Sequence, residues 1–155
     1  MSAPYNIDNA IMKILSAGMP TNVPVYKSEF LPSDDLVKLP KGYVFFDISQ
    51  MIPAFCSEGY SNPNERESVD FLLDVSVVHH DNTQRKSLQT SVLNVLQPTV
   101  SGRRTILTSY NVQGTGIFFN YIRMESVEEG AVLKTAQSTP DLVVLMMSFS
   151  GKAST

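Results

Sequence analysis

The stretch FLLDVSVVHHDNTQRKSLQTSVLNVL, which spans residues 71–96, decides the fold that we expect for this chain. In its first half, Phe71, Leu73, Val75 and Val77 alternate with Leu72, Asp74 and Ser76. Such a period of two is typical of a strand that buries one face. The sequence therefore predicts a strand over residues 69–80.

The second half of the stretch predicts a helix over residues 83–97. Asp-Asn-Thr at residues 81–83 supplies a turn and a side chain that can cap the first helical turn. The apolar residues of one helical face are Leu88, Val92, Val95 and Leu96. Pro98 then ends the pattern, because proline cannot continue a helix.

An apolar stripe near the start of the chain predicts a first helix. Its members are Ile7, Ala10, Ile11, Ile14 and Leu15. Their spacing is that of one helical face, and Gly18 and Pro20 fit the end of the helix. Residues 23–26 read as a short extended piece. Pro24 restricts this piece to a sheet edge, since proline cannot donate to a strand ladder.

Further strands are expected beyond these elements. Four ranges are rich in aromatic and β-branched residues, namely 43–48, 105–112, 117–128 and 142–149. Residues 49–67 and 129–140 read as loops, and residues 150–155 as a disordered tail. We predict one domain over residues 1–155 with an α+β fold, a mostly antiparallel sheet with two helices packed on one face.

Composition limits the classes of function. The 155 residues are 43% hydrophobic, which is enough for a core, and the net charge is −3 with scattered basic residues. That balance argues against a protein that wraps nucleic acid. The single cysteine, Cys56, excludes an intramolecular disulfide and a cysteine zinc cluster. No secretory signal or membrane span is visible, so we expect a cytoplasmic protein.

No pattern predicts catalysis, a cofactor or a metal site, and we interpret the chain as not being an enzyme. His79, His80 and Asp81 are the strongest candidate cluster, but neighbouring strand residues point to opposite faces and no third ligand is evident. We interpret them as solvated residues at a strand end. Cys56 lacks a nucleophile motif, and residues 114–116 are too short for a phosphate loop.

The predicted loop over residues 49–67 carries four apolar side chains that must be covered by something. They are Met51, Ile52, Phe55 and Tyr60. Two interpretations stay open: the loop folds over its own core, or it is an arm that contacts a neighbouring subunit. We take these four residues as the candidate subunit interface.

The order of the predicted elements resembles the tail-terminator and tail-completion family of long-tailed bacteriophages, which includes the lambda-type minor tail protein that ends tail growth. Residues 71–96 carry most of the resemblance, because a strand of that kind leads directly into a helix in this family. The N-terminal helix, the segment PKGYVFF at residues 40–46, the long loop and the closing strands over 104–149 extend it. The resemblance is one of pattern and length.

The resemblance implies a structural virion protein whose copies form a hexameric ring. Such rings cap the tail tube and join it to the head or neck, which requires a head-to-tail interface that closes by rotation. The implied partners are further copies of the chain, the tail tube protein and neck or connector proteins. DNA would pass through the lumen without sequence recognition. The implied location is the tail or neck of a virion assembled in the host cytoplasm.

Other functions stay open. A head–tail neck or completion protein would have a similar fold, because fold does not fix function. A small-molecule binding module belongs to another class, and would line a pocket with aromatic residues such as Phe45, Phe46, Phe118 and Phe119. A metal-dependent hydrolase rests on His79, His80 and Asp81 alone.

Overall fold

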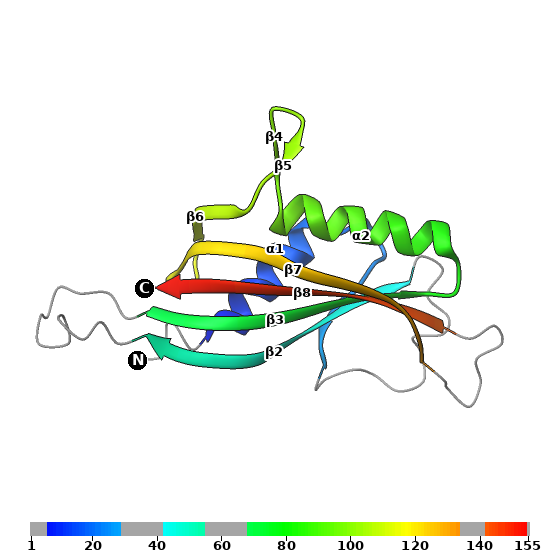
Figure 1. The fold of residues 1–155 in the computed structure, drawn as a ribbon, viewed down its shortest axis with the longest axis horizontal. Helices are drawn as coiled ribbons and strands as arrows, with labels where there is room; N and C mark the ends of the chain where they lie inside the picture. The colour runs from blue at the N-terminus through cyan, green and yellow to red at the C-terminus, as the bar shows by residue number, and fades with distance from the viewer. Residues whose placement is uncertain (1–5, 29–41, 55–67, 134–141, 155) are drawn as a thin grey trace, which may run out of the picture.

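The computed structural model describes residues 6–28, 42–54, 68–133 and 142–154. Two helices, α1 (Ile7–Gly18) and α2 (Asn82–Leu96), lie against one sheet (Figure 1). The sheet has six strands in the order β1 (Val25–Lys27), β2 (Tyr43–Ala54), β3 (Ser68–His79), β8 (Leu142–Ser154), β7 (Ile117–Leu133) and β6 (Leu107–Val112). A separate hairpin pairs β4 (Thr99–Val100) with β5 (Arg103–Arg104).

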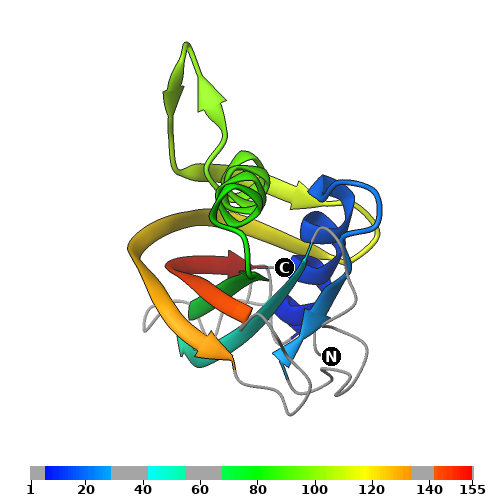
Figure 2. The ribbon, with the colours of Figure 1, turned by 90° about the vertical axis from the view of Figure 1, so that its right-hand side faces the viewer.

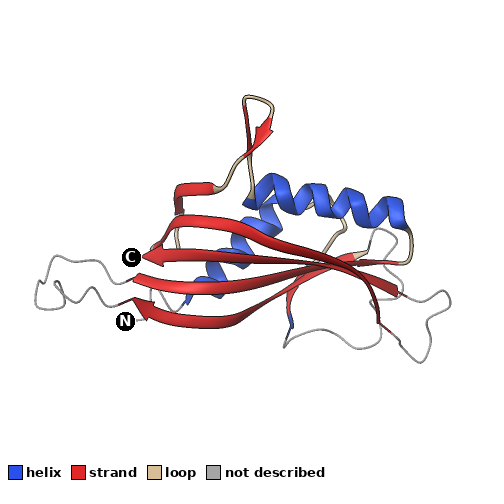
Figure 3. Cartoon of the chain, in the orientation of Figure 1, coloured by secondary structure: helices blue, strands red, loops and turns tan. Residues whose placement is uncertain are grey.

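The predicted α+β class and the mostly antiparallel sheet are confirmed. Every pairing of the six-stranded sheet is antiparallel except that of β1 with β2, which is parallel. The short β1 lies at the sheet edge, as Pro24 predicted. Figure 3 shows the long central strands side by side, and Figure 2 shows β7 bending so that the sheet curls.

The core lies between the helices and one face of the sheet, which we call the helix face. Alternation along β3 turns Val69, Phe71, Leu73, Val75 and Val77 into this core, and all five are buried. The predicted stripe of α1 is buried in full, as are Leu88, Val92 and Leu96 of α2. Asp81 caps α2 as predicted, with its Oδ2 accepting the Gln84 N–H at 3.1 Å.

The prediction that residues 49–67 form a loop is wrong for its first part. Residues 49–54 continue β2 and residues 50–54 pair with β3, with a register shift between Ile48 and Gln50. A bulge of this kind reverses the alternation, which hid the strand in the sequence. Pro53 is tolerated there because β1 pairs only with residues 44–46, leaving the rest of β2 at the sheet edge.

The predicted disordered tail is also wrong. Residues 150–154 belong to β8, which pairs with β3 on one side and β7 on the other. Ala153 is fully buried and Ser154 is 5% exposed. Small or charged residues such as Gly151, Lys152 and Ala153 are typical of a disordered terminus, but here their backbones complete two strand ladders. Residue 155 lies outside the described residues.

Strand boundaries near the C-terminal half differ from the prediction as well. β7 runs on to Leu133, beyond the predicted end at Glu128 and into the predicted 129–140 loop. Residues 103–104 form a hairpin strand, and β6 begins later, at Leu107. The turn predicted at Ser101-Gly102 closes that hairpin, and both residues have positive φ, 53° and 78°. Two-residue hairpin turns favour positive φ at both central residues, because the twist of such a turn matches the twist of the flanking strands.

Two neighbouring leucines of β3 test this assignment of faces. Leu73 is fully buried on the helix face, whereas Leu72 is 41% exposed on the other face. We expect Leu73→Ala to lower the free energy of unfolding by about 2–5 kcal/mol. Leu72→Ala, the matched control, should change it by less than about 0.5 kcal/mol. Urea unfolding followed by circular dichroism measures both, and equal losses would contradict the assignment.

Candidate functional site

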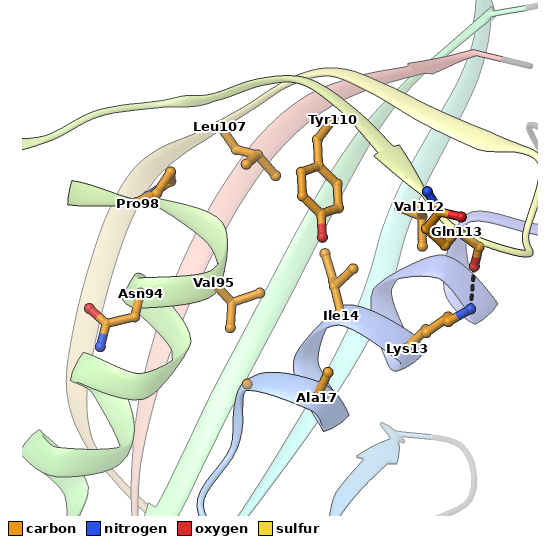
Figure 4. Close-up of a pocket in the computed structure, with 11 residues that line it drawn as sticks. Lys13, Ile14, Ala17, Asn94, Val95, Pro98, Leu107, Tyr110, Val112 and Gln113 are labelled. Carbon is orange, nitrogen blue, oxygen red and sulfur yellow. Dashed lines mark hydrogen bonds between the residues drawn. The ribbon is translucent and has the colours of Figure 1, made fainter. Parts of the chain in front are cut away.

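A groove lies between α1, the C-terminal end of α2 and β6 (Figure 4). Its volume is about 410 Å³. Its apolar lining consists of Ile14, Ala17, Val95, Pro98, Leu107 and Val112. Tyr110 points into it from β6, and Lys13 closes one end by donating to the Gln113 carbonyl. The groove is chemically suited to an apolar group and lacks an acidic side chain.

Close contact between the two helices forms the floor of this groove. Gly18 ends α1 against Val95 of α2, and a Cβ added at Gly18 would lie 2.0 Å from Val95 Cγ2. The sequence suggested Gly18 only as a helix terminator, whereas its lack of a side chain is what allows this approach. The groove itself was missed, because the elements that line it are far apart in the sequence.

Two of the four predicted subunit-interface residues, Met51 and Ile52, lie on a strand where the sequence predicted a loop. Met51 and Ile52 lie on β2 and are 42% and 51% exposed, but they point to opposite faces of the sheet. Met51 lies on the helix face, near Asp8 and Lys27, which form an ion pair of 2.9 Å. Phe55 and Tyr60 lie outside the described residues.

Ile52 instead joins Leu72 on the face of the sheet that points away from the helices, the second face. The two side chains border a small hollow of about 120 Å³ that crosses β2, β3, β8 and β7. We call it the second-face hollow, and its lining on this face is Gln50, Ile52, Asp70, Leu72, Tyr121 and Ser150. A side chain from a partner could enter it, since two of its apolar members are exposed to solvent.

The β4–β5 hairpin stands clear of the sheet and the helices (Figures 1 and 2). Val100, next to its turn, is 58% exposed, the highest value among the large apolar residues of the described chain. Ile106 and Tyr110, which follow the hairpin, are each 43% exposed. The hairpin therefore presents a second exposed apolar surface, on the helix side of the sheet.

The candidate metal cluster at His79 and His80 has a structural role. β3 ends at His79, so His80 is no longer held on the opposite face, and the two rings stack with centroids 4.3 Å apart. The interpretation of both as solvated is wrong for His79, which is 4% exposed. Its Nδ1 accepts the Asp81 N–H at 2.9 Å. No group of three potential metal ligands occurs in the part of the chain that the structure describes.

Arg85 fastens α2 to the end of β3. Its guanidinium donates to the carbonyl oxygens of His79 and His80 at 2.8 and 3.1 Å, and its Nε donates to Glu129 at 3.3 Å. Lys86 donates to the same carboxylate at 3.2 Å. The hydrogen bonds from Lys86 and Arg85 hold the pKa of Glu129 below its ordinary value. Arg85 itself is buried on α2, with 7% of its surface exposed.

Tyr43 is the one described residue whose buried side-chain oxygen lacks a hydrogen-bond partner. Its ring lies against Tyr26 and Phe45, at centroid distances of 6.3 and 6.2 Å. Burial, with a smaller contribution from the nearby Tyr26, raises the pKa of Tyr43 to about 12. A buried phenol resists ionisation because the anion would lose its hydration.

Comparison with known proteins does not identify the chain. No protein-family model matches it, and no curated protein does so significantly. Among solved structures it is similar to a chain of the virion of a native gene transfer agent particle, with a TM-score of 0.44 and 12% sequence identity. That match covers 100% of both chains. A similarity of this degree establishes neither family nor function. Neither described helix is long and apolar enough to cross a membrane.

Arg85 and its neighbour Lys86 provide a matched test of the junction between β3 and α2. Arg85→Ala leaves two carbonyl groups without their donor, so we expect it to lower the free energy of unfolding by about 1–3 kcal/mol. Lys86→Ala removes only an exposed ion pair and should cost less than about 0.5 kcal/mol. Chemical unfolding of the three proteins at neutral pH measures this. A larger loss for Lys86→Ala would contradict the role given to Arg85.

Tyr43 predicts a loss of stability at alkaline pH. Its pKa is higher in the folded chain than the ordinary value of 10, so its contribution is complete below pH 10 and declines as the pH rises toward 12. Tyr43→Phe should remove this part of the decline and leave the chain at least as stable at pH 7. Unfolding of both proteins from pH 7 to 12 measures the difference. Parallel curves would show that Tyr43 is not responsible.

Proposed function

We propose that this chain is a non-enzymatic structural protein of a phage-like virion, a tail terminator whose copies close into a ring on the tail tube. The ring would stop tube growth and join the tail to the neck. The proposal that the chain is a tail terminator is supported by the resemblance of the strand–helix unit at residues 71–96 to that family. Within the described chain, β3 does lead into α2 through the Asp81 cap, as that resemblance requires.

One observation carries the proposal of self-association: exposed apolar surfaces lie on opposite sides of the chain. Val100 projects on the hairpin at the helix side, and Ile52 and Leu72 lie on the second face. A pair of different surfaces on one chain is what a heterologous, head-to-tail interface requires. Six copies would carry a net charge of −18 from −3 each, which is compatible with passage of DNA.

A head–tail neck or completion protein is the alternative within the same class, because it would use the same kind of ring at another level of the virion. A specific observation also favours a small-molecule binding module. The groove of Figure 4 has a volume of about 410 Å³, within the range of about 300–1,000 Å³ for ligand sites. Its wide contact with solvent is a weaker match to that class.

The mass in solution across a concentration series tests the proposed ring. Six copies of the 17.1 kDa chain give a particle of about 103 kDa, and negative-stain images should show closed rings. Recruitment by purified tail tubes, in contrast with neck complexes, separates the terminator from the neck protein. A monomer at every concentration that tail tubes also fail to recruit would contradict the proposal. Thermal stabilisation by an apolar ligand would then favour the binding module.

A further inference from the structure

The β4–β5 hairpin is held firmly at its base. Thr105 donates to the Pro98 carbonyl from both its N–H, at 2.9 Å, and its hydroxyl, at 3.0 Å. The Arg104 guanidinium donates to the Gln97 carbonyl and to Asn94 on α2, at 3.1 and 3.0 Å. The tip therefore projects in a defined direction, set by the end of α2.

The hairpin tip combines an apolar side chain with a positive charge. Val100 and Arg103 form a cross-strand pair on either side of the turn, and both are exposed. No acidic residue occurs between Pro98 and Tyr110. Arg104 is engaged at the base, so Arg103 is the cation that the tip presents. A complementary surface would be apolar and acidic.

The second-face hollow has that character. Ile52 and Leu72 supply its exposed apolar rim, and Asp70 is the charged residue of its lining. Asp47 and Asp74, paired across β2 and β3, add two carboxylates to the same face. Two cations offset part of this charge, since Lys152 lies opposite Asp70 on β8 and Arg123 lies opposite Ser150 on β7, where it pairs with Glu125 at 3.0 Å. With Glu125, four carboxylates still outnumber these two cations. The hollow has room for about four water molecules, or for one aliphatic side chain.

The hairpin and the second-face hollow lie too far apart to meet within one chain. In Figure 1 the hairpin lies above the sheet, and β7 and β8 separate it from β3 and β2 on the lower side. We infer that the hairpin tip of one copy docks into the second-face hollow of the next copy. Val100 packs against Ile52 and Leu72, and Arg103 lies beside Asp70. This pairing rests on the proposed self-association and names its two surfaces.

The larger groove beside α1 is a poorer receptor for the tip. Its charged lining residue is Lys13, whose charge would repel Arg103. It also lies at the base of the hairpin of its own chain, lined by Pro98 and Leu107. The charges therefore favour the second-face hollow over the groove as the site that receives the hairpin tip.

A charge exchange tests the pairing. Arg103→Glu and Asp70→Arg should each weaken assembly, raising the concentration of half-assembly at least about tenfold, because like charges meet at the contact. An equimolar mixture of the two variants should assemble again, since each altered tip then faces the complementary altered hollow. The chain that carries both changes should also assemble. Light scattering across a concentration series measures the mass.

The control is Glu128→Arg, which makes the same change of charge as Asp70→Arg on the exposed part of β7 and should keep the wild-type mass. Circular dichroism and the unfolding midpoint report whether each variant folds, and recovery in the mixture itself requires folded chains. Wild-type assembly that both single variants retain would overturn this pairing and leave self-association intact. Failure of the mixture and of the double variant would also overturn it. A wild-type monomer throughout contradicts the proposed self-association itself.

Discussion

The packing of β3 against the two helices is the constraint on which the rest of the described chain depends. β3 is paired over its length with β2 on one edge and β8 on the other, and its helix face is buried from Val69 to Val77. Buried backbone groups must find partners, so both neighbouring strands have to run as far as β3 does. This requirement explains why residues 49–54 and 150–154 form strands, although their own sequence pattern does not predict one.

The helices cover only the helix face, and this makes the second face uneven. At the end where β2 begins and β3 finishes, Tyr43, Val78 and Val144 are buried on it, within 9% exposure. At the other end Ile52 and Leu72 are exposed among carboxylates. Exposed apolar side chains among carboxylates therefore occur at only one end of the described second face. This arrangement gives the second face one place where a partner gains contact area.

The sequence predicted those elements whose pattern is complete within themselves. The stripe of α1, the alternation of β3 and the Asp81 cap each need only local residues, and all three are confirmed. The sequence did not predict the parts of strands that form because they pair with a neighbouring strand. The bulge at residues 48–50 reversed the pattern of β2, and the end of β8 is a strand only because β3 and β7 flank it. The stack of His79 on His80 likewise depends on where β3 ends.

A rigid hairpin also bears on whether head-to-tail contacts close. Heterologous contacts generate a ring when the rotation between copies is fixed and closes, and an open filament when it does not close. A flexible arm would allow many rotations. Here Arg104 and Thr105 fix the hairpin to the end of α2, and the Arg85 contacts fix the start of α2 to the end of β3. The direction of the tip is thus tied to the sheet that carries the receiving hollow, so each copy would impose the same rotation on the next.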